Sequence, residues 1–436
     1  MNIQSVNIFC LSWRVNYFWF RRDLRLNDNV GLHAALQAGE VQPVFIFDTN
    51  ILDGLRTDDP RVSFIHSRLQ ELNMQLSKYD SALHTYYGDP LEIWRGLLSD
   101  NDIQAVYYNR DYEPYARSRE KVLKSFFSAH GVDFKGYKDQ VIFEAHDVLK
   151  SDGQPYTIFT PYMKKWLERY NDVEIKDSAL RFGQFIRGAR RIIPLNQLGF
   201  EESRIEIKPY RFHGLEDYHN VRDYPELDQT SHLSVHLRFG TVSVRECVQN
   251  AMNINETFLS ELIWREFFMQ ILYHFPHVVT HNFKAKYDAI EWRNEKGDFE
   301  AWCQGKTGYP FVDAGMRELN ETGYMHNRVR MVTASFLVKH LLLDWRRGEK
   351  YFAEKLLDYD LSANNGNWQW AAGTGCDAAP YFRIFNPTAQ MKKFDSHMHY
   401  TRKWVKDLDE KSYPQPIVDH RFARERCLNV YKAALG

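Results

Sequence analysis

The chain has 436 residues, of which 44% are hydrophobic and 26% are charged, proportions that are ordinary for a soluble globular protein. This length exceeds what one hydrophobic core normally organises, so we expect two domains. The 56 basic and 57 acidic residues give a net charge of −1, which excludes a global field that draws the protein to polyanions. A nucleic-acid site would therefore be a local basic patch.

Cysteine usage and the N-terminal stretch bear on the compartment. The five cysteines are scattered without a Cys-x-x-Cys pair, which indicates a reducing environment and argues against a cysteine metal site. The apolar start is broken by Arg14 and Asn16 and lacks a small-residue cleavage site, so we expect no signal peptide. Other apolar runs are too short to span a bilayer. We predict cytoplasmic residence, no membrane association and a monomer, with residues 1–14 as a peripheral extension.

Residues 15–140 alternate short apolar runs with amphipathic segments, which is typical of a parallel, doubly wound α/β sheet. No Gly-x-Gly-x-x-Gly follows the first run, so a dinucleotide fingerprint is absent. The charged cluster Arg21–Arg25 stands there instead, and we interpret it as surface ion pairing. The expected strands are Val15–Phe20, Val41–Phe47, Leu83–Tyr87 and Val106–Tyr108, and the expected helices are Val30–Gln37, Arg61–Ser77, Leu91–Ser99 and Tyr115–Ala129.

The rest of the chain has a different character. Residues 141–214 are rich in glycine, proline and basic or polar residues, which predicts a long connector that wraps between domains. Residues 215–436 show helical patterns and no convincing strand pattern, which predicts an all-α second domain. Within that domain, Tyr324–Trp345 has the pattern of one long helix.

The segment from Asp358 to Gln390 is the most unusual of the chain. Asn364–Asn367 prefers turns and left-handed backbone, and Trp368 and Trp370 follow it directly. Small residues let a backbone approach a flat molecule, amides and carboxylates contact its edge, and indoles stack on its faces. Composition alone fits a pocket for a large heteroaromatic cofactor and an irregular Trp-rich core loop equally well.

The same segment resembles the photolyase/cryptochrome flavoproteins. Its GNWQWAAGTG followed by DAAPYFRIFNPTAQ is the signature region of that family. The resemblance continues in FWFRRDLRLNDN, TSHLSVHLRFGTVS, ELIWREFF and YMHNRVRMVTASFLVKHLLLDW, and so covers nearly the whole chain from about Val15. It implies an α/β domain that holds an antenna chromophore and an all-α domain that binds FAD.

The resemblance also assigns residues to the flavin. The hydroxyl-rich run Thr230–Ser234 precedes a helix-like segment, which fits an anion cradle or a plain helix cap, and the resemblance favours the cradle. It implies an Arg330–Asp358 ion pair beside the isoalloxazine. It places Asn364 next to the flavin N5, where an amide cannot give up a proton as the Asp of plant cryptochromes would, and this favours repair. The implied cofactor-binding residues are Tyr218, Thr230, Ser231, His232, Leu233, Ser234, Arg265, Arg330, Asp358, Tyr359, Asp360 and Asn364.

A second face is implied for DNA. Glu261, Trp264 and Arg265 share one face of an expected helix, which by itself fits a Glu–Arg pair beside a core tryptophan. By the resemblance, Trp264 packs against an extruded lesion and Glu261 hydrogen-bonds its base edge. The implied residues that bind DNA or the lesion are Arg222, Glu261, Trp264, Arg265, Asn327, Arg328, Met331, Trp370 and Gln390.

The substrate class is argued from one position. Enzymes for (6-4) photoproducts carry two adjacent histidines where this chain has Asn327–Arg328, so the chain is similar to class I cyclobutane pyrimidine dimer photolyases. The implied activity is a light-driven carbon–carbon lyase reaction on UV-damaged DNA, in which reduced FAD passes an electron to a flipped-out dimer. The alternatives are a cryptochrome-type blue-light photoreceptor, which the absence of a long polar tail disfavours, and a light-independent nucleotide-binding oxidoreductase.

Three scattered tryptophans complete the implied machinery. Alone they are core residues, because their spacing of 53 and 23 positions is no repeat. By the resemblance they form an electron-hopping chain, with Trp368 nearest the flavin and Trp292 at the surface. The implied catalytic residues are Glu261, Asn364, Trp292, Trp345 and Trp368.

The identity of the antenna stays open. Glu113 matches a glutamate of folate-using relatives, but those relatives carry a Cys-Lys pair where this chain has Val278–Val279. A folate, a deazaflavin, a flavin or no second chromophore are all compatible with the residues. No metal is expected, because Pro276 interrupts the histidines at 274, 277 and 281 and no carboxylate completes a ligand set.

Overall fold

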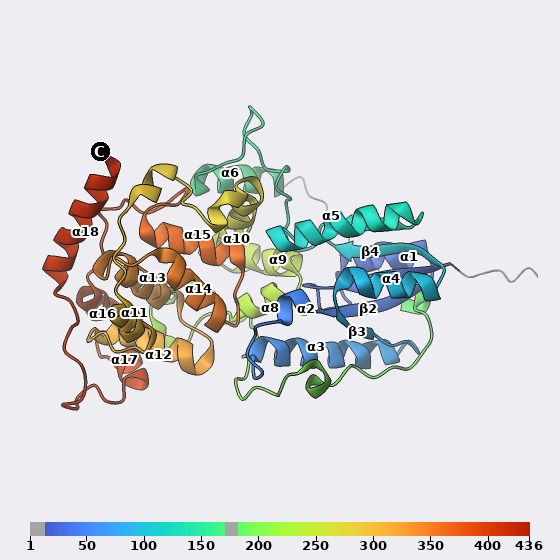
Figure 1. Ribbon diagram of the computed structural model, residues 1–436, viewed down its shortest axis with the longest axis horizontal. Coiled ribbons are helices and arrows are strands. Elements are labelled where there is room, and N and C mark those ends of the chain that lie inside the picture. Colours follow the sequence, from blue (N-terminus) through green and yellow to red (C-terminus); the bar gives the residue numbers. More distant parts are fainter. Residues whose placement is uncertain (1–13, 171–181) are drawn as a thin grey trace, which may run out of the picture.

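The structure, a computed structural model, describes residues 14–170 and 182–436. An α/β domain and a larger helical domain lie side by side along the long axis of the molecule (Figure 1). We expect residues 1–14 to be a peripheral extension, and residues 1–13 of it lie outside the described residues. Within those residues, no helix combines the length and the apolar character that crossing a bilayer requires.

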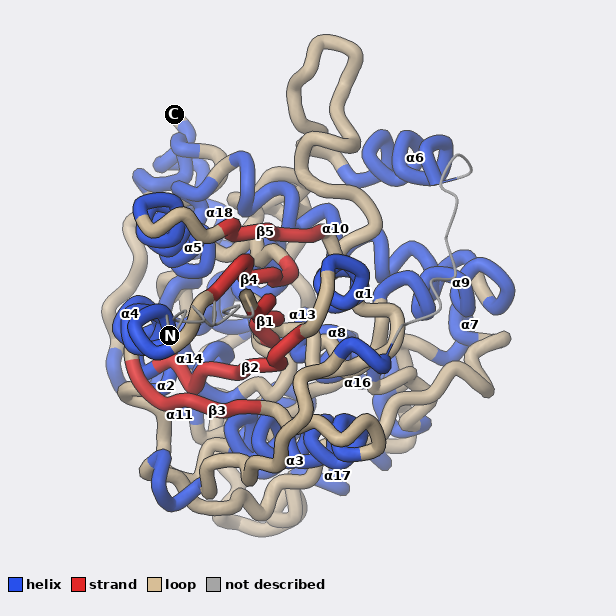
Figure 2. The backbone as a smooth tube through the Cα atoms, turned by 90° about the vertical axis from the view of Figure 1, so that its right-hand side faces the viewer, coloured by secondary structure: helices blue, strands red, loops and turns tan. Residues whose placement is uncertain are grey.

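The α/β domain is built on a parallel five-stranded sheet in the order β3-β2-β1-β4-β5 (Figure 2). The central strand β1 points Phe18 and Phe20 into one core and Tyr17 and Trp19 into another, so both faces of the sheet are buried. This confirms the doubly wound arrangement that the alternating pattern predicts. The strands are β1 (Val15–Phe20), β2 (Val41–Asp48), β3 (His84–Gly88), β4 (Ile103–Asn109) and β5 (Asp133–Tyr137).

Helices cover both faces of the sheet. α1 and α3 pack on the Phe18 side, and α4 and α5 pack on the Trp19 side (Figure 2). The carboxylates of Asp59 and Asp89 cap α3 and α4, since each accepts a hydrogen bond from a first-turn amide at 2.9 Å. The helices are α1 (Val30–Ala38), α2 (Thr49–Leu52), α3 (Pro60–Ser77), α4 (Pro90–Asp100) and α5 (Pro114–Ala129).

Two features of this domain differ from expectation. β5 was not predicted, because this edge strand, DFKGY, is partly exposed and contains no apolar run. The interpretation of Arg21–Arg25 as surface ion pairing is wrong about the surface: the arginines form ion pairs, but these pairs are largely buried. The side chains of Arg21, Arg22 and Arg25 are 6%, 11% and 10% exposed, and their partners include residues of the helical domain.

The described part of the predicted connector includes one α-helix. It contains α6 (Phe159–Tyr170), which packs on the helical domain, and the short turns η1 (Phe182–Gln184) and η2 (Leu195–Leu198). Farther on, it returns to the sheet through isolated bridges from Phe185 to Val41 and from Arg187 to Ser81. In the described part of this segment, α6 therefore contacts the helical domain, and Phe185 and Arg187 contact the sheet.

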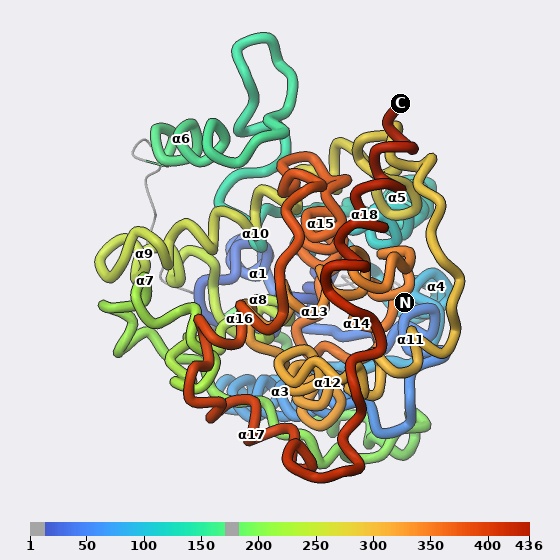
Figure 3. The backbone as a smooth tube through the Cα atoms, turned by 90° about the vertical axis from the view of Figure 1, so that its left-hand side faces the viewer, coloured from blue at the N-terminus to red at the C-terminus, as the bar shows by residue number. Residues whose placement is uncertain are grey.

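The described residues from 215 onward form helices and turns without a named strand, as expected. α18 lies on the outer face of the helical domain, against η5 and η6 (Figure 3). The elements are α7 (Tyr218–Val221), η3 (Pro225–Leu227), α8 (Leu233–Phe239), α9 (Val244–Ile254), α10 (Glu256–His274), η4 (Pro276–Val279), η5 (Ala285–Ala289), α11 (Lys296–Cys303), α12 (Pro310–Thr322), α13 (Asn327–Ser335), η6 (Phe336–His340), α14 (Trp345–Lys355), α15 (Leu361–Ala372), α16 (Pro387–Phe394), α17 (His399–Trp404) and α18 (His420–Leu435).

The prediction of one long helix over Tyr324–Trp345 is wrong. α13 begins only at Asn327, where the side chain of His326 caps it, and it passes into the wide turn η6. Leu342 then adopts a φ of +52°, and the carboxylate of Asp344 caps a new helix by accepting from the Arg346 amide at 3.0 Å. The apolar run is continuous in sequence, but this backbone turn redirects the chain.

The prediction of turns at Asn364–Asn367 is also wrong, because these residues lie within α15. The amides of Asn364 and Asn365 bind neighbouring segments, whereas that of Asn367 binds the Ala363 carbonyl one turn earlier in the same helix. Asn365, for example, donates from Nδ2 to the Val278 carbonyl at 2.8 Å. Gly366 permits a close approach to α10, since a Cβ there would stand 2.1 Å from the Phe268 ring. The segment is therefore a regular helix used as a polar scaffold.

Candidate functional site

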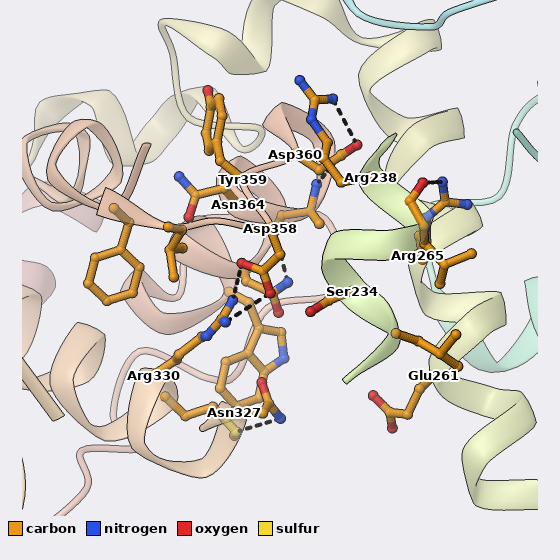
Figure 4. A pocket seen from close by; sticks show the side chains of 18 of the residues that line it. Ser234, Arg238, Glu261, Arg265, Asn327, Arg330, Asp358, Tyr359, Asp360 and Asn364 are labelled. Atoms are coloured by element: carbon orange, nitrogen blue, oxygen red, sulfur yellow. Dashed lines mark hydrogen bonds and ion pairs between the residues drawn. The ribbon is translucent and has the colours of Figure 1, made fainter. Parts of the chain in front are cut away.

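A cavity of about 290 Å³ lies inside the helical domain, between α8, α10, α13, α14 and α15. Figure 4 shows side chains from these elements converging on it. The implied cofactor residues that line it are Tyr218, Ser231, Leu233, Ser234, Arg265, Arg330, Asp358, Tyr359, Asp360 and Asn364. Residues more than 140 positions apart in the sequence thus meet around one space.

Two of the implied cofactor residues lie outside this lining. Thr230 has its hydroxyl 3.4 Å from that of Tyr324. His232 stands immediately before α8 with a φ of +53° and pairs with Asp228 at 3.0 Å. The side chain of His232 makes no cap bond to the first turn of α8. Ser231 and Ser234 line the cavity, and their hydroxyls are available to a ligand near the start of α8.

The predicted ion pair between Arg330 and Asp358 is present. Nη1 and Nη2 of Arg330 donate to the two carboxylate oxygens at 3.1 and 2.9 Å, the bidentate geometry that arginine favours. Burial works against the charged guanidinium, but Asp358 more than offsets it and raises the pKa of Arg330. The pair fixes a charged and directional surface on the cavity wall (Figure 4).

Asn364 presents a defined atom to the cavity. Its Nδ2 donates to the backbone carbonyl of Glu349 at 3.0 Å and to the carboxylate of the same residue at 2.8 Å. Since the amide nitrogen is engaged, the amide oxygen is the group left to face a ligand. Glu349 was not singled out in the sequence, and burial raises the pKa of its carboxyl.

The implied lesion residues fall into two groups. Glu261, Arg265, Asn327, Met331 and Trp370 line the cavity. Arg222, Trp264, Arg328 and Gln390 lie outside the lining.

Two of these outer residues are fixed by neighbours. Arg222 pairs with Glu261 at 2.5 Å, and Arg328 pairs with Asp223 at 2.8 Å. Arg222 thus contacts the lining residue Glu261, and Arg328 follows the lining residue Asn327, so we refer to these two arginines as the rim of the cavity.

Trp264 has one face occupied. Its ring stacks on Phe159 of α6 with a centroid distance of 3.7 Å and an interplanar angle of 9°. A base can therefore use only its other face. The stacking of a lesion on Trp264 stays a prediction for that face.

The three tryptophans differ in depth. Trp368 lines the cavity, Trp345 is fully buried, and Trp292 is half-buried. Gly348 lets the helix that begins with Trp345 lie against Trp368, since a Cβ at Gly348 would stand 2.1 Å from that indole. Trp345 and Trp368 are both fully buried, and the electron-hopping chain from Trp368 to Trp292 that the resemblance implies stays a prediction.

A buried lysine lies beyond the last of these tryptophans. The ring of Trp292 packs edge-on against that of Tyr431, with centroids 6.1 Å apart. The Nζ of Lys339 lies 3.8 Å from the centroid of the Tyr431 ring and donates to the Ala372 carbonyl at 2.6 Å. Burial lowers the pKa of this ammonium to about 8.

A second cavity, of about 150 Å³, lies in the α/β domain at the carboxyl ends of β1 and β2 and beside the segment that follows β4. Strand order reverses between β1 and β4, and ligands of open α/β sheets bind at such a point. Phe45, Phe47 and Trp19 supply aromatic walls. An ion pair between Arg119 and Asp48, 2.6 Å apart, supplies a polar corner. This space suits a flat, mostly apolar ligand.

Comparisons with known proteins identify the family. Residues 16–179 match the family described as DNA photolyase, and residues 258–412 match the FAD binding domain of DNA photolyase. The chain is 35% identical to the deoxyribodipyrimidine photo-lyase of Halobacterium salinarum, over 96% of this chain and 99% of that one. It is 34% identical to the enzyme of the same name from Escherichia coli, over 95% and 98%. The chain therefore belongs to the photolyase/cryptochrome family of flavoproteins, and its helical domain is the FAD-binding domain.

Solved structures agree at the level of the whole fold. A bacterial class III photolyase from Agrobacterium tumefaciens superposes with a TM-score of 0.83 at 33% identity, over 99% of both chains. An archaeal photolyase from Sulfolobus tokodaii with two FAD molecules gives the same TM-score at 36% identity, over 96% of this chain and 100% of that one. The two sequence relatives named above are both deoxyribodipyrimidine photo-lyases. A cryptochrome from Synechocystis also shares the fold, with a TM-score of 0.83 at 25% identity, over 96% of this chain and 99% of that one.

Proposed function

We propose that this chain is a light-driven lyase that repairs pyrimidine dimers in DNA, with FAD in the helical-domain cavity. The main support is that a single cavity brings together ten of the twelve residues implied for the flavin and five of those implied for the lesion. An electron donor and its acceptor bound in the same cavity lie close enough for direct transfer. A protein that only binds a nucleotide does not need residues for a second ligand around the same cavity.

The chemistry of the cavity wall fits FAD. The hydroxyls of Ser231 and Ser234 at the start of α8 can bind pyrophosphate oxygens, and the oxygen of Asn364 can accept a hydrogen bond from a ring N–H. The Arg330–Asp358 pair supplies charge beside the ring system. When bound in its reduced form, the flavin supplies the photoexcited electron, and the protein supplies position and dryness.

The residues on α10 and α13 handle the substrate. The dimer leaves the duplex at an unstacking cost that damage lowers, and it enters the cavity beside Met331 and Trp370. Glu261, held by Arg222, accepts hydrogen bonds from the base edge. The rim arginines Arg222 and Arg328 contact phosphates.

The substrate class is proposed from Asn327, Arg328 and Met331. The chain lacks the adjacent histidines of enzymes for (6-4) photoproducts at this place, which supports a cyclobutane pyrimidine dimer as the lesion. We propose assignment to class I on the same residues. A class III photolyase superposes with a TM-score of 0.83, so the proposal of class I rests on these residues alone.

We propose that a planar chromophore occupies the α/β cavity as the antenna. A flat ring system such as that of a flavin or a deazaflavin can stack on its aromatic side chains. The position of the Cys-Lys pair of folate-using relatives is Val278–Val279, and the backbone carbonyl of Val278 is bound by Asn365 and Gln369. Glu113, the other residue that suggested folate, is engaged in ion pairs with Arg22 and Arg238.

The test is repair of a defined substrate. The FAD-loaded chain should restore a thymine-dimer oligonucleotide under blue light and leave it unchanged in the dark. Glu261→Gln should slow repair by roughly tenfold, because a charged acceptor is lost. Glu256→Gln, on an exposed residue of the same helix, is the control and should repair at the normal rate.

Two results would contradict the proposal. A chain that binds FAD and undergoes photoreduction but restores no dimer would support the photoreceptor alternative. If the chain binds no flavin at all, both the photolyase and the photoreceptor are excluded, and the light-independent nucleotide-binding oxidoreductase is favoured.

A further inference from the structure

A buried cluster of ion pairs forms the wall between the two cavities. Arg238 of α8 lines both cavities. Glu113 lines the α/β cavity, and Asp360 lines the helical-domain cavity. Arg22, at the end of β1, lies between these two carboxylates. The wall therefore consists of charged groups contributed by both domains.

One carboxylate oxygen of the α/β domain reaches two helices of the other domain. Oε1 of Glu113 accepts from Nη1 of Arg238 at 2.6 Å and from the backbone amide of Leu361 at 3.4 Å. It also accepts from Nη1 of Arg22 at 3.0 Å. Arg238 belongs to α8 and Leu361 begins α15, and both helices contribute residues to the flavin cavity.

Asp360 contacts the same two arginines, with its Oδ2 3.5 Å from Nη1 of Arg238. Its Oδ1 caps α15 by accepting from the amides of Ser362 and Ala363 at 3.1 and 3.2 Å, and its Oδ2 contacts Nη2 of Arg22 at 2.5 Å. Burial disfavours its charge, but Arg22 and Arg238 hold the pKa of Asp360 well below its usual range. The first turn of α15 therefore depends on two carboxylates, one of them from another domain.

We propose that Glu113 is a positioning residue of the flavin cavity, which holds Arg238 and the first turn of α15 in place for FAD although it lies in the α/β domain. The inference rests on the assignment of the helical-domain cavity to FAD. α15 carries Asn364 and Trp368, so a shift of its first turn moves the cavity wall that these residues form. Glu113 acts through Arg238 and Leu361 and contributes no lining atom to the flavin cavity.

The experiment compares FAD affinity in matched variants. FAD is titrated into apoprotein, and binding is followed by quenching of flavin fluorescence. Glu113→Gln should weaken FAD binding by roughly tenfold, because hydrogen bonds to a charged acceptor are lost. The thermal unfolding midpoint of each apoprotein is measured in parallel, so that a general loss of stability is seen separately.

Asp111→Asn is the control. Asp111 lines the same α/β cavity and accepts from the same guanidinium of Arg22, at 3.2 Å, and from the Glu113 amide. Asp111→Asn removes one negative charge from the wall, as Glu113→Gln does, but it leaves the bonds of Glu113 to Arg238 and Leu361 in place. We expect FAD affinity within about twofold of the wild type, as for a substitution that leaves those contacts in place.

A charge-balanced pair covers the case in which Glu113→Gln does not fold. Arg22→Gln/Glu113→Gln should bind FAD roughly tenfold more weakly than Arg22→Gln/Asp111→Asn, since the two differ only in the carboxylate retained. Equal FAD affinity in the matched variants would overturn the inference and leave the assignment of the cavity intact. A wild-type chain that takes up no FAD would overturn both.

Discussion

The two cavities of this chain are built in opposite ways. The helical-domain cavity takes its wall from helices far apart in sequence, and polar contacts such as the Arg330–Asp358 pair fix that wall. The α/β cavity lies at the carboxyl ends of parallel strands, and aromatic side chains such as Phe47 form part of its wall beside aliphatic and charged ones. One cavity is therefore specified by individual hydrogen bonds and the other by topology. Substitutions should affect them differently.

The largest effect is expected at the polar wall. Asp358→Asn leaves the buried guanidinium of Arg330 without its carboxylate, which should cost about 4 kcal/mol of unfolding free energy and abolish FAD uptake. Denaturant unfolding and the flavin content of the purified protein measure the two effects. Asp223→Asn removes the partner of Arg328, a carboxylate that is 33% exposed against 6% for Asp358, and should cost less than about 1 kcal/mol. Similar costs for the two variants would contradict the distinction between wall and rim.

An intermediate effect is expected in the aromatic cavity. Phe47→Ala removes a side chain that is 3% exposed and should cost about 3 kcal/mol of stability, at the low end for such changes because the ring already borders empty space. FAD affinity in the other domain should stay within about twofold. Ile51→Ala, at a half-exposed position of the same cavity, is the control and should cost less than about 1 kcal/mol. A large loss of FAD affinity in Phe47→Ala would show that the cavities are not independent at this point.

The smallest effect is expected at the rim of the polar cavity. Arg222→Ala should weaken binding of dimer-containing DNA by roughly fivefold, because a phosphate contact is lost. The slope of log K against log salt concentration should become shallower by about one. FAD affinity should not change. Arg56→Ala, an exposed arginine paired with Asp58 in the α/β domain, is the control and should leave DNA affinity unaltered. An unaltered salt dependence in Arg222→Ala would remove this residue from the DNA interface.

Much of the α/β fold could be predicted because its information is local. The four expected strands and four expected helices are present, since apolar runs alternate with proline-initiated amphipathic segments. β5 could not be predicted, because an edge strand needs no apolar run. Arg22 was misplaced at the surface for a different reason. Its partner Asp360 is 338 residues away in the sequence, and no local pattern shows such a pair.

The candidate site was predictable only through its resemblance to a family. Composition left a cofactor pocket and a core loop equally supported, and it predicted turns where Asn364 lies in a helix. The helix forms because Asp360 caps it and because amides that would favour turns in isolation bind Glu349 and Val278 instead. Arg238 and Glu113 were not recognised as a wall between cavities, since their roles depend on how the two domains dock.

The buried ammonium of Lys339 has a consequence for where an oxidised tryptophan can pass its charge. A positive charge 3.8 Å from the Tyr431 ring makes removal of an electron from that phenol more costly. Tyr431 is the aromatic neighbour of Trp292 on this side, so the lysine acts as an electrostatic barrier there. If the implied tryptophan chain carries a positive hole to Trp292, this barrier keeps the hole on a half-exposed indole, where an external reductant can fill it.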